Sequence, residues 1–243
     1  MEIHGKTALI TGGAKRIGRS IALELAKKGA HILLHYRHSE KEARETCSEV
    51  KALGVSCSLV QADLSQAKEI SKMLLEIDKN SKSVDILVNS ASLFYKTPID
   101  TVSETDWDRL MDANLKGPFV LSAEIGRRMM KQNGGKVINI ADWSGFRPYR
   151  DYSAYCTSKG GLITLTKALA RDLAPKVHVN AVAPGPVLMP ADMPEHEKEA
   201  IAKTTALGRW GKPEDIAHAV TFLVENDFIN GIVLVVDGGR SIV

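Results

Sequence analysis

The sequence predicts an α/β fold in which helices cover both faces of one parallel β-sheet. Short apolar runs alternate with helical patterns along all 243 residues. These runs are continuous rather than alternating, which is typical of parallel strands buried on both faces. Right-handed crossovers between such strands place helices on both sides of the sheet. We therefore expect a doubly wound sheet within a single domain, residues 1–243.

Seven segments meet the strand pattern, so we expect a seven-stranded sheet. They are 7–11, 31–36, 56–61, 85–90, 136–141, 178–183 and 232–237. The first crossover is clearly helical, because Ile17, Ile21 and Leu25 recur at helical spacing. Gly29 follows a Lys-Lys pair, a common pattern at helix C-termini. The first two strands and this helix therefore form a βαβ unit.

A glycine-rich turn follows the first predicted strand and leads directly into the first helix. It reads Thr11-Gly12-Gly13-Ala14-Lys15-Arg16-Ile17-Gly18. Glycines let backbone N–H groups approach a pyrophosphate at the positive end of the helix dipole. A purely structural turn needs similar residues, but the position between strand and helix favours a dinucleotide site and a Rossmann fold.

The end of the second predicted strand indicates which dinucleotide binds. Folds that prefer NADH usually carry an acidic residue about 20 residues beyond the glycine turn. Here the segment reads His35-Tyr36-Arg37-His38-Ser39, without a carboxylate. Its last three residues can donate hydrogen bonds to a 2′-phosphate, and Arg16 could reach the same group. The alternative is that the basic residues only solvate a loop; we expect NADPH rather than NADH.

A helix predicted over 151–174 carries a tyrosine and a lysine on one face. Tyr155 and Lys159 are four residues apart, so both side chains project in the same direction. A nearby ammonium stabilises tyrosinate and lowers the pKa of the phenol, which suits proton donation to a substrate that receives hydride. Ordinary surface pairs share this spacing, so the surrounding motifs must decide.

The chain resembles the short-chain dehydrogenase/reductase family along nearly its whole length. Seven ordered motifs carry the resemblance: the glycine-rich turn, Asp63-Leu64, Asn89-Ser90-Ala91, Asn114, Tyr155 with Lys159, Pro184-Gly185 and Asp237-Gly238-Gly239. The resemblance implies that Lys159 holds the nicotinamide ribose, and that Asn114 anchors a water-mediated proton path to it. The residues then expected at the cofactor are Gly12, Arg16, Ile17, Gly18, Tyr36, Arg37, His38, Ser39, Asp63, Leu64, Asn89, Ser90, Ala91, Tyr155, Lys159, Pro184, Gly185 and Val187.

Three departures from the commonest family pattern resemble the pteridine reductases. Arg16 replaces a glycine, serines replace two residues of the usual Asn-Asn-Ala-Gly, and Asp142 stands where a catalytic serine is expected. The resemblance implies hydride transfer from NADPH to a C=N bond of a pterin or dihydropterin. Asp142 would hold the proton of Tyr155 towards a ring nitrogen, and Phe94 would stack on the pterin. The residues expected at the substrate are Ser92, Phe94, Asp142 and Tyr155, and the catalytic set is Tyr155, Lys159, Asp142 and Asn114.

Two other functions fit the same residues. A carbonyl reductase of 3-oxoacyl thioesters or small ketones would use the same tyrosine and lysine, with Asp142 only capping a turn and Ser144 as the working hydroxyl. Independently of the function, the alternative for Phe94 is a core aromatic under a loop. A non-catalytic NADPH sensor is disfavoured, because binding alone requires no proton donor.

Composition excludes several other classes. The net charge is +3 with scattered basic residues, so we expect no nucleic-acid partner. Cys47, Cys57 and Cys156 show no CxxC spacing, which predicts reduced thiols and no metal site. No signal-peptide pattern or long apolar stretch appears, so we expect a cytoplasmic protein away from membranes.

Two expectations concern the surface of the molecule. Four prolines within 184–197 predict a loop, and we expect a substrate loop near 184–200 at the carboxyl ends of the strands. The family resemblance also implies a homotetramer. It would assemble through the helices around 103–132 and 152–172 and through the C-terminal strand.

Overall fold

A seven-stranded parallel sheet forms the centre of the computed structural model, which describes residues 1–79, 83–189 and 193–243. The strand order is β3-β2-β1-β4-β5-β6-β7. The strands are β1 (Thr7–Ile10), β2 (His31–Tyr36), β3 (Cys57–Gln61), β4 (Ile86–Asn89), β5 (Gly135–Ile140), β6 (Val177–Pro184) and β7 (Val233–Val236). The order reverses between β1 and β4, which is the switch point where such sheets bind ligands.

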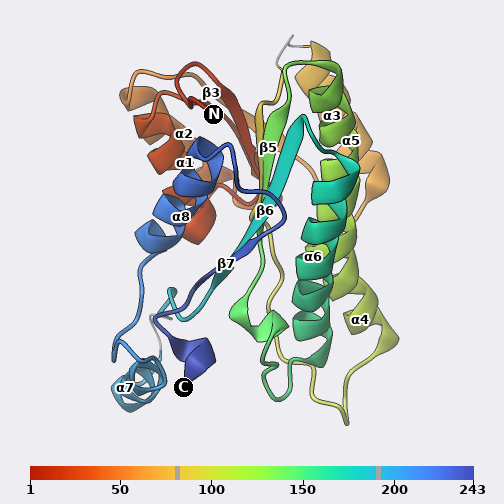
Figure 1. Ribbon diagram of the computed structural model, residues 1–243. Coiled ribbons are helices and arrows are strands. Elements are labelled where there is room, and N and C mark those ends of the chain that lie inside the picture. The colour runs from red at the N-terminus through yellow and green to blue at the C-terminus, as the bar shows by residue number, and fades with distance from the viewer. Residues whose placement is uncertain (80–82, 190–192) are drawn as a thin grey trace.

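Helices cover both faces of the sheet, as predicted (Figure 1). One face carries α1 (Arg16–Lys27), α2 (Glu40–Ala52) and α8 (Pro213–Glu225). The other carries α3 (Ala67–Lys79), α4 (Glu104–Met111), α5 (Gly117–Lys131) and α6 (Ser153–Asp172). Successive strand residues point to opposite faces, so Ile10 packs in the core under α1 and α8, while Leu9 packs in the core under α3 and α5.

The predicted loop near 184–200 is partly helical. The short helix α7 (Glu195–Lys203) begins directly after Pro194. Glu195 and Glu197 lie in its first turn, where the helix dipole favours acidic side chains. The loop prediction was therefore wrong for residues 195–200, and residues 190–192 lie outside the described part of the chain.

Two of the three cysteines form a disulfide, which contradicts the prediction of reduced thiols. Cys47 on α2 and Cys57 at the start of β3 are bonded, with their Cα atoms 5.5 Å apart. Packing of α2 beside β3 brings them together, and their separation of 10 residues carries no recognisable motif. Cys156 is free and buried.

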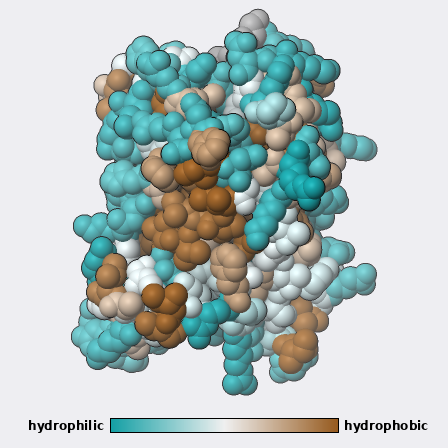
Figure 2. All heavy atoms as spheres, in the orientation of Figure 1, coloured by the Kyte–Doolittle hydropathy of each residue, from teal (hydrophilic) through white to brown (hydrophobic). Residues whose placement is uncertain are grey.

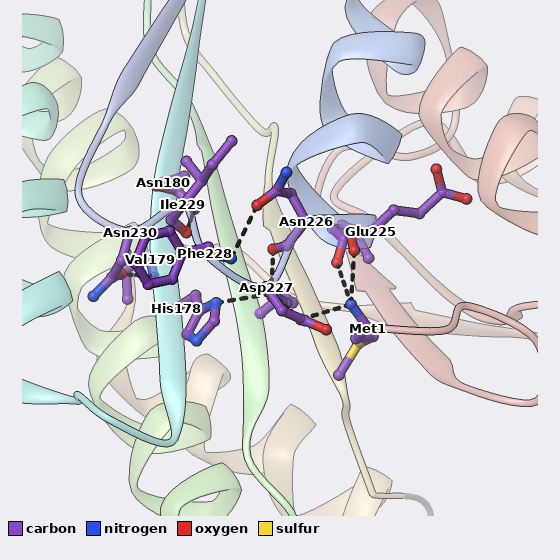
Figure 3. Close-up of polar contacts among 12 residues, drawn as sticks. Met1, His178, Val179, Asn180, Glu225, Asn226, Asp227, Phe228, Ile229 and Asn230 are labelled. Atoms are coloured by element: carbon purple, nitrogen blue, oxygen red, sulfur yellow. Dashed lines mark hydrogen bonds and ion pairs between the residues drawn. The ribbon is translucent and has the colours of Figure 1, made fainter.

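A buried lysine joins the amino ends of two central strands to the segment after α8. The Lys136 ammonium, 2% exposed, donates to the Asn226 carbonyl at 2.7 Å and to Asp227 Oδ1 at 2.8 Å, and lies 2.8 Å from His178 Nδ1. Asp227 also accepts a hydrogen bond from the Met1 amino group (Figure 3). This cluster lies at the amino ends of the strands, whereas the glycine-rich turn lies at their carboxyl ends.

Within the described ranges, no helix is long and apolar enough to span a bilayer. The same part of the chain brings together no three His, Cys, Asp or Glu side chains that could hold a metal ion. The longest helix, α6, has 20 residues and carries the predicted tyrosine and lysine.

Candidate active site

The glycine-rich turn packs tightly against the segment that follows β4. Gly12 has a φ of +63°, and a Cβ there would lie 2.9 Å from the Ala91 Cα. The Thr11 hydroxyl accepts hydrogen bonds from the backbone N–H of Ser90 at 2.9 Å and of Ala91 at 3.0 Å. These contacts hold the carboxyl ends of β1 and β4 as one surface. Sequence reasoning placed Thr11 in the turn but missed this role.

Arg16, where the family usually has a glycine, begins α1 in an unusual backbone conformation. Its φ is +56°, in the left-handed region that glycine adopts without strain. The usual glycine therefore has a conformational reason, and Arg16 adopts the same conformation at some cost.

A buried histidine fixes the glycine-rich turn from below. His35 is 2% exposed; its Nδ1 accepts from the Gly12 N–H at 3.1 Å, and its Nε2 lies 3.0 Å from the Ala62 carbonyl. A carbonyl only accepts, so Nε2 carries the proton and the ring is neutral. Burial lowers the pKa of His35 to about 4. Sequence reasoning did not single out His35; its place at the end of a buried strand was the available indication.

The segment after β2 holds its arginine against an acidic residue. Arg37 pairs with Asp63 at 2.8 Å, and its Nε is buried without a partner among the described residues. Burial opposes ionisation of Asp63, but hydrogen bonds from Ser65 and the charge of Arg37 hold its pKa below the usual value. The Tyr36 side chain is 8% exposed and packs in the core.

Several other residues predicted at the cofactor are buried and hold the scaffold. The Asn89 amide donates to Ser122 Oγ at 3.0 Å and to Asn139 Oδ1 at 2.8 Å, which ties β4 to α5 and β5. A Cβ on Gly185, directly after β6, would lie 2.5 Å from the Asp237 Cα. The side chains of Leu64 and Val187 are also buried, and Ile17 is partly buried against the same core as Val187.

The tyrosine of α6 is hydrogen-bonded to the aspartate that follows β5. The Tyr155 hydroxyl donates to Asp142 Oδ2 at 2.9 Å. The other carboxylate oxygen, Oδ1, accepts from the Ser144 N–H at 2.7 Å and so caps the short helix Trp143–Gly145. Asp142 therefore makes a contact that fits each of the two alternatives, a cap and a partner of Tyr155, and its catalytic role stays a prediction. The Ser144 hydroxyl is buried without a hydrogen-bond partner in the described chain.

The lysine of α6 is buried beneath this pair. Lys159 Nζ donates to the Ile140 carbonyl at 2.9 Å and lies 5.7 Å from the centroid of the Tyr155 ring. Burial lowers the pKa of Lys159 to about 8, although the charge of Asp142 opposes this. Burial, and then Asp142, raise the pKa of Tyr155 well above 10. In this arrangement burial and Asp142 dominate, so the net shift in the pKa of the phenol is upward rather than downward as expected.

Asn114 lies in one turn of π-helix, Asp112–Lys116, between α4 and α5. Such turns widen a helix and frequently occur at functional sites. The Asn114 amide donates to the Leu93 carbonyl at 2.9 Å and to Ser158 Oγ at 3.2 Å, and its oxygen accepts from the Leu93 N–H at 2.8 Å. Ser92 Oγ also donates to this oxygen, at 3.3 Å. Asn114 thus joins the loop after β4 to the residue next to Lys159; the water-mediated path stays a prediction.

Aromatic side chains line the surface beside the tyrosine hydroxyl. Phe94 stacks on Tyr152 with centroids 4.7 Å apart, and its ring meets that of Tyr155 edge-on at 4.8 Å. Phe94 is 57% exposed, so the alternative of a core aromatic was wrong. Further along, Trp143 meets Tyr149 edge-on at 5.2 Å.

The family model described as short chain dehydrogenase matches residues 6–200 of the chain. The chain belongs to the short-chain dehydrogenase/reductase family. It is therefore an oxidoreductase of a family that uses nicotinamide cofactors.

Several relatives of this short-chain dehydrogenase/reductase are similar over almost their full length. A 3-oxoacyl-(acyl-carrier-protein) reductase of Staphylococcus aureus is 36% identical over 239 residues, covering 96% of this chain and 97% of the relative. A 2-dehydro-3-deoxy-D-gluconate 5-dehydrogenase of Pseudoalteromonas atlantica is 35% identical over 246 residues, covering 98% and 96%. A crystal structure of a putative gluconate dehydrogenase from Agrobacterium tumefaciens superimposes with a TM-score of 0.94 at 31% identity, covering 100% of this chain and 98% of that one. These names support the family but not the pteridine reductase subgroup.

Proposed function

We propose that this short-chain dehydrogenase/reductase reduces a carbonyl group of a small molecule with hydride from NADPH. The observation that carries the proposal is the Tyr155 hydroxyl, which lies between an aromatic surface and the Asp142 carboxylate above the buried Lys159. The names of the similar proteins, a 3-oxoacyl reductase and a dehydrogenase of an oxo sugar acid, favour carbonyl chemistry over C=N reduction.

The carboxyl ends of β1, β2 and β4 suit a dinucleotide. Position 12 has room only for glycine, because a Cβ there would lie 2.9 Å from the Ala91 Cα, and the turn leads directly into the positive end of α1, which suits a pyrophosphate. The unpartnered Nε of Arg37, beside His38 and Ser39 at the start of α2, offers donors to a 2′-phosphate. NADPH, when bound, supplies the hydride. We infer NADPH rather than NADH because the segment after β2 lacks an acidic residue.

Tyr155 supplies the proton in this account. Its raised pKa keeps the phenol protonated at neutral pH, so it is ready to donate to a carbonyl oxygen that gains negative charge. The ammonium of Lys159 then balances the charge left on the tyrosine oxygen. Before substrate binds, the Asp142 carboxylate holds the Tyr155 hydroxyl in place by accepting its hydrogen bond.

One observation favours a second candidate, the reduction of a pterin C=N bond. A carboxylate rather than a serine hydroxyl holds the Tyr155 proton, and the exposed Phe94 ring beside it offers a stacking surface for a flat heterocycle. Replacing Asp142 with Ser separates the two candidates. Carbonyl reduction should survive Asp142→Ser, whereas pterin reduction should fall far more than cofactor binding.

Two exposed apolar surfaces support a homotetramer. Figure 2 shows apolar side chains gathered over α8 and β7, where Phe222, Ile232 and Val235 are exposed. On the helices of the other face, Met111, Leu115 and Phe119 line a hollow of about 400 Å³ with Leu165 of α6. Two separate apolar surfaces of this kind suit two different two-fold interfaces, the arrangement of a closed tetramer.

Parallel assays test the proposed function. Oxidation of NADPH should be followed with an acetoacetyl thioester, a 5-oxo sugar acid, dihydrobiopterin and dihydrofolate, and repeated with NADH. We expect turnover of at least one carbonyl substrate, and faster turnover with NADPH. Turnover of the pterins alone would replace the proposal with the second candidate.

A further inference from the structure

The C-terminal turn carries an arginine to the aromatic surface of the candidate site. The Asp237 carboxylate accepts hydrogen bonds from the Gly239 N–H at 2.9 Å and the Ser241 N–H at 2.7 Å, and Gly239 has a φ of +80°. The chain then forms the short helix η3 (Arg240–Ile242). Asp237 of the Asp-Gly-Gly motif therefore fixes the direction in which Arg240 leaves the turn.

A second arginine ties this turn to the segment beside the catalytic pair. Arg147, which follows the short helix capped by Asp142, donates to the Val243 carbonyl at 2.7 Å and to the Ser241 carbonyl at 3.3 Å. Because Asp142 caps that helix and bonds Tyr155, the C-terminal turn and the proton donor share one support.

Arg240 lies over the aromatic rings of this support. Its guanidinium carbon is 4.7 Å from the centroid of the Trp143 ring and 5.8 Å from that of Tyr149. Trp143 Nε1 donates to the Tyr149 hydroxyl, which locks the two rings together. A guanidinium stacked on a ring through its flat face keeps its in-plane N–H donors free, and these match a carboxylate in two parallel hydrogen bonds.

The charge of Arg240 has no counter-ion in the part of the chain that the structure describes. Across residues 1–79, 83–189 and 193–243, no carboxylate lies within ion-pair distance of its guanidinium. It is only partly exposed, and Trp143, on which it stacks, directly follows Asp142 in the chain. Among the described residues, a cation without an ion-pair partner therefore lies on Trp143, which is next in the chain to the aspartate that accepts the Tyr155 hydrogen bond.

We propose that Arg240 binds a carboxylate on the carbonyl substrate, so that the enzyme prefers small oxo acids over neutral ketones. This rests on the proposed carbonyl reduction. Arg240 would hold the acid group while the carbonyl oxygen meets Tyr155, so its contribution is to substrate binding and orientation. Attraction of this kind weakens as added salt screens the charges.

Paired substrates test the proposal, because esterification removes the charge and keeps the ketone. Acetoacetate, 4-oxopentanoate and 5-oxohexanoate should be compared with their methyl esters. We expect Arg240→Gln to raise KM for the preferred acid about tenfold, the loss of one charge-assisted contact, with little change in kcat. The kcat/KM for the matching ester should stay the same, and Arg240→Lys should recover part of the loss. Arg150→Gln is the matched control, because the Arg150 side chain is 97% exposed and directly follows Tyr149 in the chain.

Equal losses for acid and ester, or no loss for either, would overturn the role of Arg240. Calorimetric titration of the NADP⁺-loaded protein with the same acids and esters gives a readout that needs no turnover. If no ketone is reduced, the proposed function fails. If the acids then bind more tightly than their esters, and this difference disappears in Arg240→Gln, the anion site is still supported. Equal binding of acids and esters would exclude it.

Discussion

In the proposed reaction, three side chains control the position of one proton. Tyr155 holds it, Asp142 accepts the hydrogen bond, and Lys159 is buried below. Spacing along α6 predicted that the tyrosine and lysine share a face. The opposite shift in the pKa of Tyr155 could not be predicted, because it depends on burial and on a carboxylate from another element.

Asp142→Asn should move the alkaline limit of activity to lower pH. Asparagine keeps an oxygen that can cap the Trp143–Gly145 helix, but it lacks the charge that raises the pKa of Lys159. The pKa of Lys159 is about 8, so in the parent enzyme kcat/KM should fall as pH rises through about 8. A pH profile of kcat/KM measures the shift. An unchanged alkaline side of this pH profile would show that Asp142 acts only as a cap.

His35 should make the fold sensitive to acid. The pKa falls from 6.5 in the unfolded chain to about 4 in the fold, so the neutral form stabilises the protein fully above 6.5. This contribution, about 3 kcal/mol, is lost as pH falls from 6.5 through about 4. In His35→Gln the free energy of unfolding should depend less on pH over that window, as denaturant titrations would show. His4→Gln, at an exposed position, should keep the parent slope.

At the scale of elements, hydrophobic periodicity and the order of the motifs predicted the strands of the sheet. All seven strands lie within two residues of their predicted bounds. The helix α7 was missed because the four prolines that indicated a loop all lie before its first residue, Glu195. The Cys47–Cys57 bond was missed because only the folded chain brings α2 and β3 together. Arg240 was missed for the same reason, because its contact with Trp143 joins two segments that lie far apart in the sequence.

The segment between α8 and β7 should depend on its contact with Lys136. Asp227→Asn removes the negative partner of a buried ammonium, which keeps only the Asn226 carbonyl and His178 nearby. We expect the free energy of unfolding to fall by about 1–2 kcal/mol. Asp78→Asn removes the pair with Arg128, in which neither side chain is buried, and should cost less than about 0.5 kcal/mol. Equal losses in the two variants would contradict the importance of burial.

At the scale of the whole molecule, the two apolar surfaces should assemble four chains. Light scattering should give the mass of a tetramer for the parent protein. Phe119→Asp should halve that mass, because a charge on the α5 surface blocks one interface and leaves the surface over α8 and β7 intact. Val235→Lys should also halve the mass, because it places a charge on the surface over α8 and β7. A monomeric parent protein would contradict the assembly.

The most direct test of the central claim is to follow the transferred hydride into the product. NADPH that carries deuterium at the transferred position should be incubated with the preferred oxo substrate, and the product examined by mass spectrometry. We predict an alcohol with one deuterium on the former carbonyl carbon, formed at least about 100-fold more slowly by Tyr155→Phe. Deuterium found only in a reduced pterin, or an alcohol formed equally fast without the Tyr155 hydroxyl, would contradict the account.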